Sequence, residues 1–219
     1  MSDLLALTRR SLLLGVPFAG AYLPQMVRMY FAEAAGAAAK FLARPDGPRV
    51  GALAFDGWDM HINEGAVKGR LADLLGALDG AIAAIEANMG DAWRETVVAL
   101  VTEFGRTAHI NGSNGTDHGT ATAALFAGGA LNGERVIAHW PGLKETDLQD
   151  KRDLKPTTDL RSVLKGLLRD HLHLNQGHLE ATAFSDSTAG GRVGFHSKRA
   201  RHSLSNPVRT SNDARGNGR

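Results

Sequence analysis

The sequence contains no cysteine, which excludes disulfide bonds, thiolate metal ligands and cysteine nucleophiles. It also has no uninterrupted apolar run of the ~18–20 residues that a membrane-spanning helix needs, so we expect no membrane span. The hydrophobic fraction of 43% and the charged fraction of 22% argue against wholesale disorder. A chain of 219 residues with this composition is expected to form one globular domain, or one domain and a tail.

The small formal net charge of +2 hides an uneven distribution. Residues 189–219 contain seven Lys and Arg and a single acid, Asp213. With these removed from the totals of 25 bases and 23 acids, residues 1–188 have a net charge of −4. A basic tail can bind nucleic acid, but this one has no aromatic or RGG-type repeat, so we predict no specific nucleic-acid partner.

The two ends differ from the middle of the chain. Within residues 1–27, Arg9 and Arg10 precede a short apolar run that ends in small residues, which is the outline of an export signal or of an irregular start. Residues 179–219 are rich in Gly, Ser, Asn and Arg and are expected to form a disordered basic tail. The predicted domain therefore covers residues 28–178.

Within this domain, apolar runs alternate with helical patterns. The expected helices lie at residues 31–43, at 71–85 ending near Gly90, and after the cap residues Thr158 and Asp159. The expected buried strands lie at residues 50–55 and 96–102, with weaker ones at 123–127 and 135–138. Strands separated by long crossovers predict an α/β fold: a doubly wound, mostly parallel sheet with helices on both faces.

Three polar clusters follow the expected strands. They contain Asp56, Asp59 and His61, then Glu103 and Arg106, and then Asp117 and His118 in a Gly- and Asn-rich loop that starts at Asn111. Ligands of open parallel sheets bind at the carboxyl ends of strands, so we expect these side chains to meet at one edge.

Carboxylate oxygens and imidazole nitrogens suit a divalent cation such as Zn, Mn, Mg or Ca. The predicted metal ligands are Asp59, His61, Glu103, Asp117 and His118. Arg106 is the predicted contact to the anionic group of a substrate, because a guanidinium binds an oxyanion bidentately. Two ions at such a site would favour the hydrolysis of phosphate or sulfate esters.

The segments "GALAFDGWDMHINEG", "RLADLLGALDGAIAAI", "TVVALVTEFGRTAHINGSNGTDHGTATAALFAGGAL" and "RDLKPTTDLRSVLKGLLRDHL" together resemble a bacterial family, domain of unknown function 1501. The resemblance covers roughly residues 30–175 and is to the C-terminal half of that family. The family is similar to the alkaline phosphatase and sulfatase superfamily, and its members commonly begin with a twin-arginine export signal.

The resemblance implies a doubly wound sheet with metal ligands at strand ends, a small anionic substrate and a periplasmic location. A chain without a working signal would stay in the cytoplasm. Two ligand assignments stay open: either Glu103 replaces the superfamily's aspartate and His118 has a separate role, or Asp117 and His118 are a displaced Asp-His pair. In relatives a preceding half supplies the nucleophile, so we expect a truncated form whose N-terminal half is encoded separately. Two functions follow: a metal-dependent hydrolase of phosphate or sulfate esters, or a non-catalytic metal- or anion-binding or structural protein.

Overall fold

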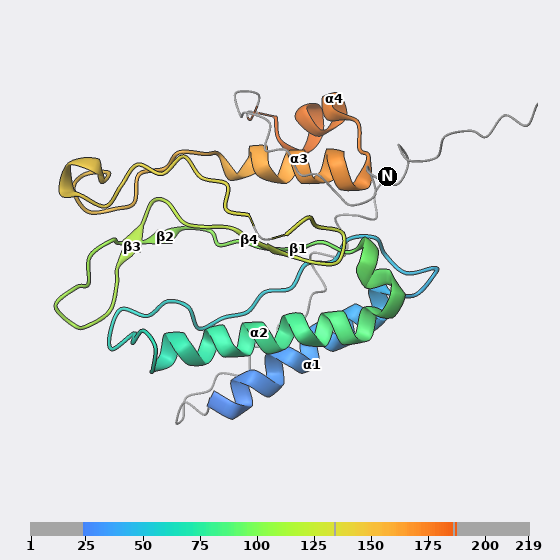
Figure 1. Ribbon diagram of the computed structural model, residues 1–219, viewed down its shortest axis with the longest axis horizontal. Helices are drawn as coiled ribbons and strands as arrows, with labels where there is room; N and C mark the ends of the chain where they lie inside the picture. The colour runs from blue at the N-terminus through green and yellow to red at the C-terminus, as the bar shows by residue number, and fades with distance from the viewer. Residues whose placement is uncertain (1–23, 134, 186, 188–219) are drawn as a thin grey trace, which may run out of the picture.

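The computed structural model describes residues 24–133, 135–185 and 187. The signal-like segment before residue 24 and most of the predicted tail lie outside this part of the chain. Figure 1 shows three layers: the helices α1 (Pro24–Leu42) and α2 (Arg70–Met89), a ribbon of four short strands, and the helix α3 (Leu160–Leu172) on the far side of the ribbon. The mixed α and β composition predicted from the sequence is confirmed.

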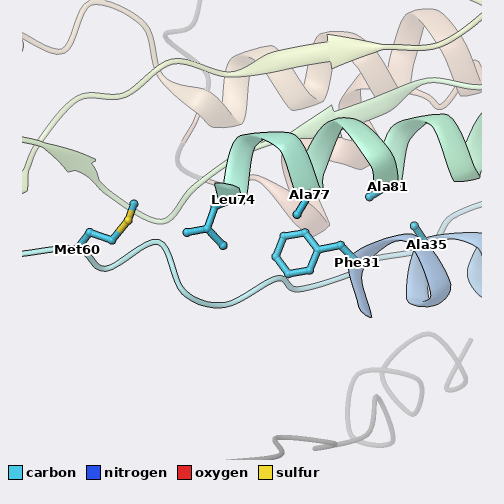
Figure 2. Packing of buried hydrophobic residues seen from close by; sticks show 6 residues of the cluster. All are labelled: Phe31, Ala35, Met60, Leu74, Ala77 and Ala81. Atoms are coloured by element: carbon cyan, nitrogen blue, oxygen red, sulfur yellow. The ribbon is translucent and has the colours of Figure 1, made fainter. Parts of the chain in front are cut away.

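Helices α1 and α2 pack against each other and form the main apolar core. Pro24 opens α1, where its fixed φ and missing N–H are tolerated. The contacting faces are rich in small residues, which let the two backbones approach closely, and Figure 2 shows the ring of Phe31 pointing from α1 toward α2. The buried cluster consists of Phe31, Ala35, Met60, Leu74, Ala77 and Ala81. Both helices overlap the ranges predicted from periodicity, and α1 starts earlier than expected.

The four strands form a long antiparallel ribbon. Strand β1 (Val98–Leu100) pairs with β4 (Leu125–Ala127), and β2 (Gly105–Arg106) pairs with β3 (His118–Gly119). Leu100 pairs with Leu125, and Gly105 pairs with Gly119. Four residues (101–104) therefore separate β1 from β2, whereas five residues (120–124) separate β3 from β4. One extra residue of this kind, as in a β-bulge, shifts the register and re-aims the side chains that follow.

The doubly wound parallel sheet is not found in the described residues, where both ladders are antiparallel. An apolar run predicts that a strand is buried, but the direction of its pairing depends on the partner strand. Here the loop of residues 107–117 brings the chain back directly beside itself, so β2 and β3 pair antiparallel. Residues 50–55 form neither a helix nor a strand, and Val50 and Leu53 are exposed. The weak strand predicted at 135–138 is also not formed.

The remaining elements are short, apart from α3. A 3-10 helix, η1 (Gly90–Glu95), links α2 to the ribbon, and η2 (Glu145–Asp147) precedes the segment that leads to α3. Asp159 caps α3 as predicted, accepting a hydrogen bond from the Arg161 backbone N–H. The elements α4 (Gln176–His178) and η3 (Leu179–Ala183) form helical turns, and η3 lies at the start of the predicted tail.

None of the described helices combines the length and the apolar character that crossing a bilayer requires.

Candidate metal site

The first two site residues come from the irregular segment between α1 and α2. Met60 belongs to the buried core, whereas Asp59 and His61 on either side of it are exposed and half-exposed. The Met60 N–H donates to the Trp58 carbonyl at 3.0 Å, so the chain turns at Asp59, and the two polar side chains stay at the surface while Met60 is buried. The core contact of Met60, visible near Leu74 in Figure 2, thus positions both polar side chains.

The next site residues come from the loop that joins β2 to β3. The Asn111 side-chain oxygen accepts hydrogen bonds from the backbone N–H groups of Ser113 (2.9 Å) and Gly115 (3.1 Å), a local turn that Asn favours. The Asn111 amide also donates to the His61 carbonyl at 3.0 Å. These bonds dock the loop on the segment of His61 and bring Asp117 and His118 beside it.

Three side-chain atoms converge on one point. Asp59 Oδ1 lies 2.9 Å from His61 Nε2 and 2.9 Å from His118 Nε2, and the two Nε2 atoms are 3.3 Å apart. Ligands about 2.1 Å from an ion lie roughly 3.0 Å apart in octahedral and roughly 3.4 Å apart in tetrahedral geometry. The three observed separations between these atoms fall close to this range. Asp59, His61 and His118 therefore fit one divalent ion with their atoms where they are.

Asp117 orients the ring of His61 through the Nδ1 atom. Its Oδ1 lies 2.9 Å from His61 Nδ1 and accepts a second bond from the Asn111 amide at 3.0 Å. In the tautomer whose Nδ1–H donates to the Asp117 carboxylate, Nε2 keeps the lone pair that a cation would take. The hydrogen bond from His61, followed by that from Asn111, lowers the pKa of Asp117.

Arg106 holds Asp59 in place. Its Nη1 donates to Asp59 Oδ1 at 2.7 Å, while Nε donates to the Thr116 hydroxyl at 3.0 Å and Nη2 donates to the Thr116 carbonyl. The Arg106 hydrogen bond, with a further one from His118, lowers the pKa of Asp59 to about 2. Asp59 is therefore a carboxylate at neutral pH. The Thr116 hydroxyl donates in turn to Glu64 Oε2 at 2.7 Å, which completes a chain of polar contacts behind the site.

The structure sorts the residues predicted from sequence into three groups. Asp59, His61 and His118 form the cluster, and Asp117 and Arg106 support it from behind. Glu103 and Asp56 are exposed, and neither belongs to the cluster found among the described residues. The cluster matches neither of the two open assignments as stated: it contains His118 without Asp117, and its carboxylate belongs to Asp59 rather than to Glu103.

Three supporting residues were not among the predicted site residues: Glu64, Asn111 and Thr116. The Asn-Gly pair at 111–112 is typical of a turn. Because this turn is close to Asp117 in the sequence, it could have identified Asn111 as a supporting residue of the site. Nothing in the local sequence marks Glu64, because its contact with Thr116 spans 52 positions.

Two histidines and one carboxylate on a solvent-exposed surface define a candidate site for a single divalent metal ion with an open side. The family described as "Protein of unknown function (DUF1501)" matches residues 25–183, and the chain belongs to this family. No curated protein and no solved structure matches the chain.

Proposed function

We propose that this chain binds one divalent metal ion through Asp59, His61 and His118. The observation that supports the proposal most directly is the His61–Asp117 contact, which leaves Nε2 facing Asp59 and His118. Histidines that ligate metals commonly donate their other ring N–H to a carboxylate in this way. Two imidazoles and one carboxylate suit a borderline ion such as Zn²⁺ or Mn²⁺ better than Ca²⁺, which prefers oxygen ligands.

A hydrolytic role for the same site is the second candidate. Three protein ligands leave coordination positions open, and a divalent ion supplies Lewis acidity to an ester oxygen and lowers the pKa of water. The Thr116 hydroxyl is held between Arg106 and Glu64, so it is not free to act as a nucleophile. For the hydrolase candidate we therefore propose water, rather than Thr116, as the nucleophile. Relationship to the alkaline phosphatase and sulfatase superfamily, as its C-terminal half, would place the substrate among phosphate or sulfate esters.

Titration of the metal-free protein with Zn²⁺ and Mn²⁺ by isothermal calorimetry tests metal binding. We expect one equivalent to bind and to raise the thermal midpoint, with His61→Ala and His118→Ala each losing this response. His109→Ala is the matched control, because His109 lies exposed in the same loop region outside the cluster. A protein whose thermal melt is indifferent to both metals and to EDTA would overturn the proposal.

The role of Asp117 is tested separately. Asp117→Ala removes the acceptor that orients His61 but none of the three cluster ligands, so Zn²⁺ affinity should fall by about 10- to 100-fold. Unchanged affinity in a folded variant would contradict the orienting role. Turnover of aryl phosphates and sulfates with Zn²⁺, Mn²⁺, Mg²⁺ or Ca²⁺ tests the hydrolase candidate, which requires that His61→Ala abolish any activity found.

A further inference from the structure

A second arginine, Arg152, lies beside the candidate metal site. Its Nη2 donates to the backbone carbonyl of His118 at 3.3 Å, so the guanidinium reaches a residue whose imidazole belongs to the cluster. The hydrogen bond to Asp153 is the main reason that the pKa of Arg152 is raised, and the Asp117 carboxylate adds to this effect through space. The Arg152 guanidinium, paired with Asp153, therefore lies against the backbone of a cluster residue.

Backbone and side-chain contacts hold Arg152 in position. The Arg152 carbonyl accepts a hydrogen bond from the Ala108 N–H at 3.0 Å, which ties this segment to the chain just after β2. Its Nη2 donates to Asp153 Oδ2 at 3.1 Å, and Nε lies 2.8 Å from Asp153 Oδ1. Asp153 is only 3% exposed and accepts a further bond from the Thr120 hydroxyl at 3.0 Å. Such an anchored guanidinium loses little freedom when it binds a ligand.

The outer end of Arg152 is open, in contrast to that of Arg106. The side chain of Arg152 is 59% exposed, against 23% for Arg106. Within the described part of the chain, the contacts of Arg152 use Nε and Nη2 and leave Nη1 without a partner. Arg106 instead uses all three of its nitrogens on Asp59 and Thr116. The residue predicted from sequence as the anion contact is thus a positioning residue for Asp59.

We propose that Arg152 recognises the anionic group of a ligand at the Asp59–His61–His118 cluster, and that the site takes small tetrahedral oxyanions such as phosphate or sulfate. The inference rests on metal binding at that cluster. One oxygen of the anion would lie on the ion and a second on Arg152 Nη1, so the two positive groups would share one ligand. A neutral ligand of the ion would gain nothing from Arg152.

Inorganic phosphate and inorganic sulfate, titrated by calorimetry into the full chain preloaded with one equivalent of Zn²⁺, test the inference. A hydrogen bond to a charged group contributes about 1.5–3 kcal/mol, so Arg152→Gln should weaken binding of either anion by roughly 10- to 100-fold. Arg152→Lys keeps the charge beside buried Asp153 and serves if the Gln variant does not fold; we expect about 10-fold weaker binding. Imidazole, a neutral metal ligand, should bind all variants equally.

Arg44→Gln is the matched control, because Arg44 is also exposed and also forms a two-bond contact with a nearby aspartate, Asp46. It should leave anion binding unchanged. If Zn²⁺ does not bind the wild-type chain, the proposed function fails. If Zn²⁺ binds but neither anion does, or folded Arg152→Lys binds both as tightly as wild type, the inference about Arg152 is overturned while metal binding stands.

Discussion

Gly115→Ala is the substitution that most directly tests how the loop of residues 111–118 builds the site. A Cβ at position 115 would lie 2.7 Å from the Ile62 backbone nitrogen and closer still to the His61 carbonyl group. Ordinary contacts between nonbonded heavy atoms are about 3.5 Å, so the two backbones must separate by at least roughly 0.8 Å. Backbone atoms cannot rotate out of the way as a flexible side chain could.

This displacement would separate His61 from the two loop residues that it contacts. His61 meets Asp117 at 2.9 Å and His118 at 3.3 Å, and metal sites tolerate ligand displacements of only about 0.2 Å. We therefore expect Zn²⁺ affinity to fall by about 10- to 100-fold, measured by competition with a chromophoric chelator. The free energy of unfolding of the metal-free chain, measured in urea, should also fall, because Met60 of the buried cluster is the residue next to His61.

Gly112→Ala is the control in the same loop, since a Cβ there meets nothing within 4 Å. It should bind Zn²⁺ within about twofold of wild type. The reasoning is refuted if folded Gly115→Ala binds Zn²⁺ as tightly as wild type, or if Gly112→Ala loses as much affinity.

Three further predictions concern stability. Leu74→Ala removes a side chain that is 1% exposed in the core, and should lower the free energy of unfolding by about 2–5 kcal/mol in urea melts. Asp159→Ala removes the cap of α3 and should cost about 1 kcal/mol in the same assay. The hydrogen bond from Arg152 lowers the pKa of buried Asp153 below 3.8, so its contribution is present above that pH and is lost as the pH falls through the lowered value. Wild type and Asp153→Asn should therefore differ most in stability above pH ~5 and converge at lower pH.

Each of these has its own control. Leu75→Ala alters the neighbouring leucine, which is 47% exposed, and should change stability by less than about 1 kcal/mol; equal losses at both positions would contradict the packing argument. Asp159→Asn keeps a capping oxygen and should be milder than Asp159→Ala, so equal effects would exclude capping as the cause. A difference between wild type and Asp153→Asn that stays constant from pH 7 to pH 3 would contradict the assigned pKa shift.

Local sequence patterns predicted the helices well. The period of leucines in α2 and the Ala-rich stretch of α1 each describe one apolar face, and one apolar face is what a helix packed against a single neighbour requires. The Asp159 cap could also be predicted from the sequence, because it depends on residues that are two positions apart. The direction of strand pairing could not be predicted from the sequence, because the same apolar run fits a parallel or an antiparallel neighbour.

The sequence by itself determined which residue types are available for the site: Asp59 and His61 at a two-residue spacing, and Asp117 next to His118. Only the tertiary structure decided their roles, because His61 and His118 are 57 positions apart and meet through the docking of one loop on another. Which nitrogen of His61 faces Asp117, and which arginine is tied to Asp59, depends on hydrogen bonds between distant segments. Short-range patterns describe which face of a segment is buried, whereas a ligand set is defined by distances that only the folded chain creates.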